Sequence, residues 1–307
     1  MISGPASIAG QPTLSVVIPT RNRGDVICRA VESALSSSRS DIEVVVVDDG
    51  SADDTAFEIS QIVDRRLRFH QLDSTGNANR ARNTGARLST GALIAFLDSD
   101  DAFGPNRIPR LIDFFSHRLD VDCLVDGYVD VTRGSKRTHR MPQHTPGPQG
   151  FRHMLLAHLV PLTNSAITLR RSAFEAVGGY DEMMPRHQDR EFLLRMARSH
   201  SIWFGVSTDV DKHRMARSLS HEFDGYIDGL DALAARCPEY HLPENEQIFR
   251  YLIVRGILKA IATGHWPAAL REFRQWRRAP HLPKDYVRCL RAYRSGRSQR
   301  LLAQDGR

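Results

Sequence analysis

Cysteine is scarce in this chain of 307 residues, and the four that occur lie far apart. Cys28, Cys123, Cys237 and Cys289 form no CxxC pair, which argues against a zinc site and against a disulfide scaffold. No apolar run approaches the length needed to cross a bilayer. Residues 1–13 lack the basic start and apolar core of a signal peptide. Together these absences predict a cytoplasmic protein.

Two glycine-rich signatures of nucleotide binding are also missing. No Gly-x-Gly-x-x-Gly follows the first apolar run, so the chain lacks a dinucleotide-binding fingerprint, and no Walker-type lysine loop occurs. Any nucleotide site must therefore be built from other residues.

Positive charge is concentrated at one end of the chain. Residues 250–307 contain fourteen Lys or Arg and three acidic residues, a balance of +11, whereas the formal charge of the whole chain is +6. The rest of the chain therefore carries −5, and the basic end has no recognisable nucleic-acid-reading motif, so we expect no nucleic-acid partner. The basic region is interpreted either as a packed appendage with a solvated basic side or as a contact with an anionic membrane or an acidic partner.

A strand, a polar turn and a helix recur three times before residue 100. The strands are predicted from apolar runs at residues 14–18, 43–47 and 92–97. This regularity favours an α/β fold with a mainly parallel sheet. It also brings three polar clusters to the carboxyl ends of the strands, where open α/β sheets bind ligands. These clusters comprise residues 20–23, 48–51 and 98–101.

Further elements follow from apolar periodicity. Residues 67–72 are predicted to form an edge strand, and Pro19 is expected to end the first strand. Strands are also expected at 122–132, 166–170 and 202–206, a loop or link at 133–150, and helices at 25–37, 76–89, 107–115, 154–158, 188–199 and across 221–307.

Carboxylates crowd the ends of two predicted strands. Asp98, Asp100 and Asp101 repel one another unless a cation or a shared proton offsets their charge, and such oxygen ligands suit Mg²⁺ or Mn²⁺ held with a substrate phosphate. The alternative is a polar turn that caps the next helix. Asp48 and Asp49 come too early to cap a helix and could accept hydrogen bonds from a nucleobase or a ribose.

Two residues in the second half are candidates for chemistry. Asp189 projects on the same side of its predicted helix as the buried residues Phe192 and Leu193. It is either a general base facing a cleft or the cap of its own helix. His213 is a lone histidine, a type of residue that is more often structural than catalytic.

Six short motifs occur in an order and at spacings that carry a resemblance. They are Pro19 to Asn22, Val47 to Thr55, Ala81 to Asn83, Phe96 to Asp101, Gly178 to Glu182, and Gln188 with Asp189. Over residues 12–220 the chain resembles a family 2 glycosyltransferase with the GT-A fold. The resemblance implies inverting transfer of a sugar from a nucleotide diphosphate donor.

The resemblance also implies roles for individual residues. Asp189 corresponds to the catalytic base, although Gln188 replaces the acidic residue usual before it. The metal, Mn²⁺ or Mg²⁺, would be bound by Asp98 and Asp100 with His213, before which the usual Tyr-Arg pair is replaced by Asp211 and Lys212. The nucleotide contacts implied are Pro19, Thr20, Arg23, Asp48, Asp49, Arg82 and Ser99.

The expected layout is a lead-in at 1–12, a GT-A domain at 13–220 and a basic helical region at 221–307.

The expected donor nucleotide is UDP, with dTDP and GDP open. The expected acceptor is a saccharide or a lipid-linked sugar in cell-surface polysaccharide synthesis. Peripheral contact of the protein with the inner membrane face is also expected. One alternative is a sugar-phosphate nucleotidyltransferase, which needs a glycine-rich loop absent from residues 19–23. The other is a non-catalytic nucleotide-sugar-binding protein, against which the full set of carboxylates argues.

Overall fold

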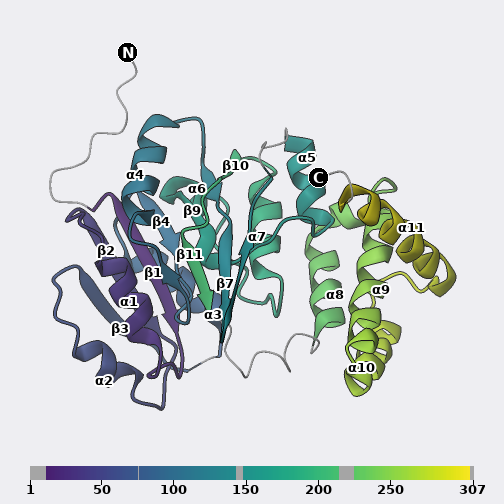
Figure 1. Ribbon diagram of the computed structural model, residues 1–307, viewed down its shortest axis with the longest axis horizontal. Helices are drawn as coiled ribbons and strands as arrows, with labels where there is room; N and C mark the ends of the chain where they lie inside the picture. The colour runs from purple at the N-terminus through teal and green to yellow at the C-terminus, as the bar shows by residue number, and fades with distance from the viewer. Residues whose placement is uncertain (1–11, 75, 143–147, 214–224, 305–307) are drawn as a thin grey trace. The chain divides into compact units, whose positions relative to one another are not determined.

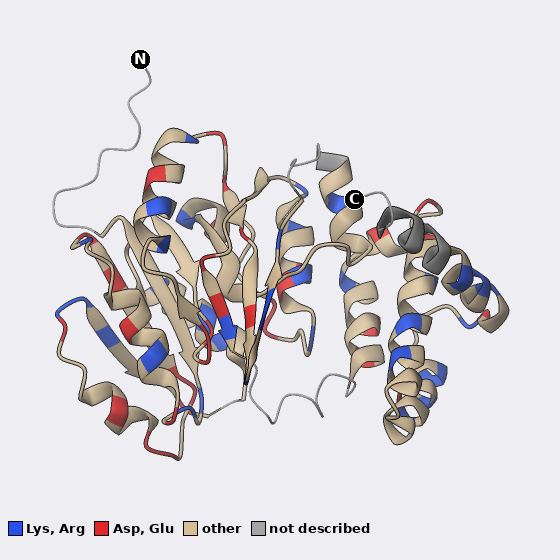
Figure 2. Cartoon of the chain, in the orientation of Figure 1, with Lys and Arg blue, Asp and Glu red and all other residues tan. Residues whose placement is uncertain are grey.

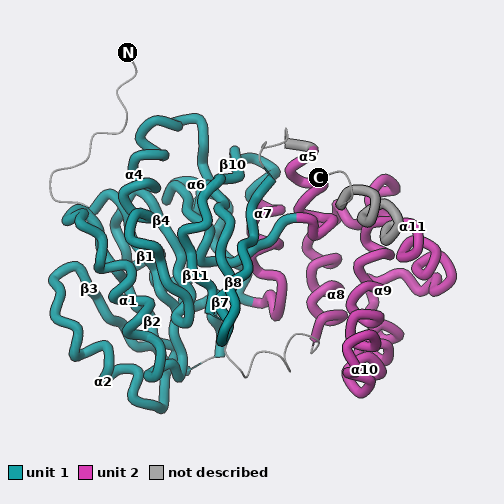
Figure 3. Tube along the Cα trace, viewed as in Figure 1, with its two compact units in different colours: residues 1–148, 160–182, 196–215 teal, residues 149–159, 183–195, 216–307 magenta. Residues whose placement is uncertain are grey.

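The computed structural model describes residues 12–74, 76–142, 148–213 and 225–304. The chain divides into two compact units, the first comprising residues 1–148, 160–182 and 196–215, and the second 149–159, 183–195 and 216–307 (Figure 3). The second unit thus joins the basic C-terminal region to two segments that precede it in the sequence. Most of the predicted lead-in and the boundary predicted at residue 220 lie outside the described residues.

The first unit is built on a seven-stranded sheet of order β10-β6-β9-β4-β1-β2-β3 (Figure 1). All neighbouring strands are parallel except β9, which runs antiparallel to β4 and β6. The mainly parallel α/β sheet and the edge position of β3 are confirmed. The strands are β1 (Leu14–Thr20), β2 (Ile42–Asp48), β3 (Leu67–Gln71), β4 (Leu93–Phe96), β6 (Cys123–Val125), β9 (Ile167–Arg170) and β10 (Ile202–Phe204).

The central strands β1, β2 and β4 are buried along their whole length and are mainly apolar, as expected for strands of a sheet covered by helices. The helices of this unit are α1 (Ile27–Leu35), α2 (Thr55–Ser60), α3 (Ala78–Leu88), η1 (Asn164–Ala166), α4 (Arg107–His117) and α6 (Arg171–Ala176). Gly85 lets α3 approach the sheet closely, since a Cβ at this position would lie 2.4 Å from Cγ1 of Val17. Gly85 and the buried Ala81, which clusters with Val45 and Val47, therefore serve packing of α3 on the sheet.

The prediction that Pro19 ends its strand was wrong, because β1 continues to Thr20 and Pro19 pairs with Val47. The oxygen of Val17 accepts the N–H of Leu97, so the backbone polar groups of Val17 face β4. Because every second residue of a strand directs these groups to the same side, the nitrogen of Pro19 also faces β4. The ladder with β4 ends at the Val17–Phe96 pair. No residue of β4 is therefore paired with Pro19, and the N–H that proline lacks is not needed there.

A second sheet of four strands has the order β5-β11-β7-β8. Its strands are β5 (Ala102–Phe103), β7 (Tyr128–Thr132), β8 (Ser135–His139) and β11 (Val210–His213). Two predictions were wrong here, because residues 135–139 form a strand rather than a loop, and residues 202–206 are not the last strand. The polar residues of β8 are held by backbone pairing with β7 across a hairpin at Gly134, whose φ is +86°.

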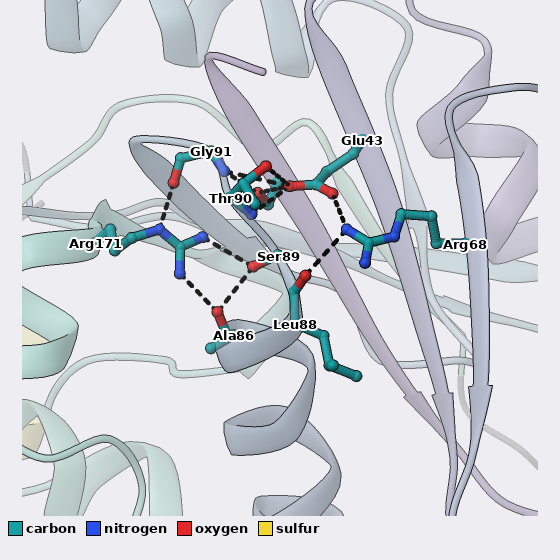
Figure 4. Close-up of polar contacts among 9 residues, drawn as sticks. Glu43, Arg68, Ala86, Leu88, Ser89, Thr90, Gly91 and Arg171 are labelled. Atoms are coloured by element: carbon teal, nitrogen blue, oxygen red, sulfur yellow. Dashed lines mark hydrogen bonds and ion pairs between the residues drawn. The ribbon is translucent and has the colours of Figure 1, made fainter. Parts of the chain in front are cut away.

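A polar network ties the sheet together at the amino ends of its strands (Figure 4). The buried Glu43 carboxylate accepts hydrogen bonds from the Ser15 hydroxyl at 2.8 Å and the Thr90 N–H at 2.6 Å, and pairs with Arg68 at 2.9 Å. Burial raises the pKa of Glu43, but these donors outweigh it and lower the pKa overall. Arg171 donates to three groups around the end of α3. The network anchors the turn that leads from α3 into β4.

The second unit is helical throughout its described residues, as predicted for the C-terminal region. Its elements are α5 (Pro148–Leu156), α7 (Gln188–Met196), α8 (Tyr226–Arg236), η2 (Pro238–His241), α9 (Glu246–Ala262), α10 (Trp266–Arg278) and α11 (Tyr286–Gln304). The buried face of α9 includes Phe249, Leu252 and Ile253. Gly264, with φ of +79°, joins α9 to α10. Within the described part of the chain, no helix is long and apolar enough to cross a membrane.

Candidate nucleotide-sugar site

The polar clusters that follow β1, β2 and β4 meet at one cavity of about 230 Å³ in the first unit. The carboxyl ends of neighbouring parallel strands converge there, as expected for a ligand site in an open α/β sheet. Predicted site residues that line the cavity are Pro19, Thr20, Arg23, Asp49, Arg82, Asp98, Ser99 and Asp100. The structure therefore brings most of the predicted site together from four separate elements.

Four further residues line this cavity that were not predicted as ligand contacts, namely Arg21, Gly76, Ala78 and Ala81. Gly76 has a φ of +69°, and a Cβ there would lie 2.6 Å from Nη1 of Arg21. A side chain at this position would require the guanidinium of Arg21 to shift, and the positive φ also favours glycine. The sequence signal for Gly76 was a glycine close to the start of a predicted helix. The sequence alone could not show that the side chain of Arg21 lies against this glycine.

Asp48 and Asp49 have different environments although they are adjacent. The fully buried Asp48 accepts hydrogen bonds from the Ser51 hydroxyl at 2.5 Å and from Nε2 of Gln71 at 3.1 Å, and it does not line the cavity. We therefore assign Asp48 to the turn and not to direct contact with a nucleotide. Asp49 lines the cavity and accepts the N–H of Asn77, the N-cap of α3, at 2.9 Å.

Asp98 is held by an arginine across the cavity wall. Nη2 of Arg82 lies 2.6 Å from Oδ1 of Asp98, and the Asp98 N–H donates to the Ser165 hydroxyl at 3.0 Å. Burial raises the pKa of Asp98, but the positive charges of Arg82 and Lys212 outweigh it and hold the pKa below its usual value. Asp98 is thus ionised and already neutralised by a protein cation.

Asp100 differs, because no side chain of another described residue donates to its carboxylate or pairs with it. Burial, and next the negative charge of Asp98, raise the pKa of Asp100. An under-compensated carboxylate on the wall of a cavity is stabilised by a cation brought from outside.

Asp101, the third carboxylate, is fully buried and serves the scaffold. It accepts hydrogen bonds from the Ser165 hydroxyl at 2.6 Å and from the backbone N–H of His213 at 3.1 Å. Burial, with the charges of Asp98 and Asp100, raises its pKa to about 7 even though Lys212 opposes this. Nζ of Lys212 lies 3.9 Å from Asp101. Burial lowers the pKa of Lys212, but the three carboxylates outweigh it and raise the pKa.

The carboxylates on the cavity wall are the candidate ligands for the expected divalent cation. Among the described residues, no group of three or more His, Cys, Asp or Glu side chains is arranged to hold a metal ion. The backbone N–H of His213 donates to Asp101 and its side chain does not line the cavity, so a role of His213 as a metal ligand stays a prediction. One unpaired carboxylate, Asp100, beside a second, Asp98, nevertheless fits Mg²⁺ or Mn²⁺ that takes its remaining ligands from substrate phosphates and water.

Asp189, the predicted base, belongs to the second unit. It is half-buried in the first turn of α7, and its Oδ1 accepts the N–H of Arg190 at 2.8 Å. His187, the residue before the start of α7, has a φ of +61° and is packed against Tyr226. Burial and the charge of Arg190 lower the pKa of His187 to about 3, so it is neutral. The role of Asp189 as a base stays a prediction.

Comparison with proteins of known sequence gives the same assignment as the motifs. The chain is 35% identical over 192 residues to the succinoglycan biosynthesis protein ExoO of Rhizobium meliloti, covering 62% of this chain and 51% of ExoO. It is 26% identical over 198 residues to the uncharacterized glycosyltransferase RT0329 of Rickettsia typhi, covering 63% of this chain and 61% of that protein. The chain therefore spans little more than half the length of these relatives.

Comparison with solved structures identifies the fold. S. aureus TarS 1-349 in complex with UDP-GlcNAc superposes with a TM-score of 0.63 at 19% identity, covering 78% of this chain and 71% of that one. The mannosyltransferase PcManGT from Pyrobaculum calidifontis, in complex with GDP-Man and Mn²⁺, gives 0.58 at 16% identity, covering 92% and 86%. The sheet is therefore that of the GT-A glycosyltransferases. The family model described as Glycosyl transferase family 2 matches residues 15–178, and the chain belongs to this family.

Proposed function

We propose that this glycosyltransferase moves a sugar from a nucleotide diphosphate, with UDP favoured, to an acceptor hydroxyl with inversion at the sugar carbon. The observation that carries the proposal is the single cavity in which Thr20, Asp49, Arg82, Asp98 and Asp100 meet. The bound UDP-GlcNAc of TarS supports UDP, and the GDP-Man of PcManGT keeps GDP open. The succinoglycan role of ExoO supports an acceptor in polysaccharide synthesis, either a saccharide or a lipid-linked sugar.

The proposed roles at the donor follow from charge. Asp49 would accept the N–H of the base at the buried end of the cavity, near Thr20. Arg82 and the arginines of the first turn, Arg21 and Arg23, would offset the charge of the diphosphate. A divalent cation on Asp100 and Asp98, when bound, would supply further positive charge for the departing diphosphate. Ser99 and Pro19 would shape the wall.

The transfer step needs a proton acceptor because the acceptor hydroxyl has a pKa far above neutral. In the proposal the Asp189 carboxylate takes this proton as the acceptor oxygen bonds to the sugar carbon. The bond from that carbon to the diphosphate oxygen breaks, and its electron pair leaves with the diphosphate. Inversion requires the base on the face of the sugar opposite the leaving group.

Calorimetric titration of UDP, GDP and dTDP, each with and without Mn²⁺, tests the donor site. We expect one nucleotide to bind in a Mn²⁺-dependent manner and the binding to be lost in Asp100→Ala. Asp113→Ala is the matched control, because it removes an exposed carboxylate from α4, away from the cavity lining. Binding of no nucleotide under any condition would refute the proposed donor site.

A further inference from the structure

Helix α10 is fixed to the second unit by one face only. Ala269, Glu272 and Trp276 are buried on this face. The Glu272 carboxylate accepts the backbone N–H of Ile227 at 2.8 Å, and Nε1 of Trp276 donates to the oxygen of Pro283 at 2.9 Å. The inner face is thus fully engaged, and the opposite face is directed to solvent.

Large apolar side chains at helical spacing line an exposed flank of α10, beside its buried face. Trp266, Leu270 and Phe273 are 63%, 52% and 38% exposed. At 3.6 residues per turn, positions separated by four and three residues fall within an arc of about 60° and form one stripe. Exposed large apolar residues scattered singly are normal, but an aligned stripe that ends in tryptophan marks an interaction surface.

Arginines flank the stripe on its exposed side. Arg274, Arg277 and Arg278 are all exposed, and residues 265–295 contain eight Lys or Arg against two acidic residues. Of those two, Glu272 is buried and Asp285 lies 3.0 Å from Arg288. The remaining charged residues of α10 and of the beginning of α11 are all basic (Figure 2).

The beginning of α11 extends this surface. The Tyr286 ring lies 4.7 Å from that of Trp276 and 5.9 Å from that of Phe273, so the two helices are in contact. Val287 and Leu290 are 60% and 50% exposed and alternate with further arginines. Two adjacent helices thus present the same combination of apolar and basic side chains.

We propose that this surface, the α10 face (Trp266, Leu270, Phe273, Arg274, Arg277 and Arg278), binds the surface of an anionic lipid bilayer. The arginines match anionic headgroups, and the Trp-Leu-Phe stripe matches the boundary between headgroups and acyl chains. A nucleic acid or an acidic protein would use the arginines but would leave the apolar stripe without acyl chains to enter. The inference goes beyond the proposed transfer reaction, because lipid binding requires neither donor nor acceptor.

Co-sedimentation of the full chain with lipid vesicles, without nucleotide, tests the inference. We expect binding to vesicles that contain phosphatidylglycerol and little binding to pure phosphatidylcholine. R274Q/R277Q/R278Q should weaken binding on the order of 100-fold, at roughly fivefold per arginine. W266A/L270A should weaken it about tenfold or more through lost apolar contact.

Matched controls change the same kinds of residue on the first unit. R133Q/R137Q/R140Q removes three exposed arginines, and F57A/V63A removes two exposed apolar side chains. Both controls should bind vesicles like the wild type. Every substituted residue is exposed, so all variants should retain the wild-type circular dichroism spectrum.

Quenching of tryptophan fluorescence by brominated lipid shows whether the stripe enters the bilayer. The quenching should be present in the wild type and reduced in Trp266→Phe. Vesicle binding unchanged in both α10 variants would overturn the inference. Loss of binding only in the arginine variant, with no quenching, would also overturn it and would indicate a soluble polyanion as the partner. Neither result bears on the donor site, which is assayed by nucleotide binding alone.

Discussion

Replacing Arg82 with methionine should strengthen the binding of Mn²⁺ to the chain when no nucleotide is present. Without nucleotide, Arg82 already neutralises Asp98. A cation that uses Asp98 must therefore displace the guanidinium, and the cost of breaking the ion pair is subtracted from its affinity. Methionine keeps most of the side-chain volume while removing the charge.

The structure sets the size of this effect. The two charged groups are 2.6 Å apart, and their side chains are 5% exposed for Arg82 and 21% exposed for Asp98. A hydrogen bond between charged groups contributes about 1.5–3 kcal/mol, and the low exposure keeps solvent from screening this pair strongly. A contribution of about 2 kcal/mol corresponds to an affinity for Mn²⁺ that is about 30-fold higher in Arg82→Met.

Titration of Mn²⁺ followed by electron paramagnetic resonance near neutral pH measures this affinity directly. A double-mutant cycle with Asp98→Asn isolates the pair, because the gain should vanish when Asp98 is already neutral. Arg80→Met is the matched control, since Arg80 lies on the same helix but does not line the cavity. Equal or weaker Mn²⁺ binding by Arg82→Met would refute the reasoning, because Asp98 would then not contribute to the cation site.

Three further substitutions test the cavity and its scaffold. Gly76→Ala should weaken nucleotide binding, because φ is positive at this position and the new Cβ would lie 2.6 Å from Nη1 of Arg21, so the guanidinium must move away from its place in the cavity wall. Calorimetry against Gly134→Ala, where φ is also positive but the space is open, separates this clash from backbone strain. Glu43→Gln should lower the free energy of unfolding by about 1–3 kcal/mol, measured in urea, because an amide cannot accept from every donor around it. Burial raises the pKa of Asp209, but Arg107 and Arg110 of α4 outweigh it and lower the pKa from 3.8 to about 2. The stability that the ionised Asp209 gives to the fold is therefore present above pH 3.8 and lost as the pH falls toward 2. Asp209→Asn should therefore cost about 2 kcal/mol at neutral pH and nothing at about pH 2, and an equal cost at both would contradict this account.

The parts of the fold that could be predicted from the sequence are those fixed by local pattern. Continuous apolar runs located β1, β2 and β4, and apolar periodicity located the first residues of α4 and α7. The strands β8 and β11 could not be predicted in this way, because both are short and mainly polar, and β8 is largely exposed. Their extended conformation depends on backbone pairing with β7, which only the folded chain supplies.

The candidate site divides in the same way. The carboxylates at the strand ends could be located from their positions after apolar runs, but their individual states could not. Asp98, Asp100 and Asp101 look alike in sequence, yet one pairs with Arg82, one has no side-chain partner among the described residues, and one is buried against Ser165. These differences arise from contacts between segments distant in the chain, which no local pattern encodes.

Asp189→Asn separates catalysis from helix capping at the one predicted site residue in the second unit. Oδ1 of Asp189 accepts the N–H of Arg190, and asparagine keeps this acceptor while losing the ability to take up a proton. If the carboxylate is the base, hydrolysis of the donor, in which water replaces the acceptor, should slow by about 10²–10⁴-fold with nucleotide affinity unchanged. Asp189→Ala should hydrolyse the donor as slowly as Asp189→Asn does, but it should also lower the stability of α7. A rate for Asp189→Asn close to that of the wild type, together with a destabilised Asp189→Ala, would leave Asp189 as a cap and require another base.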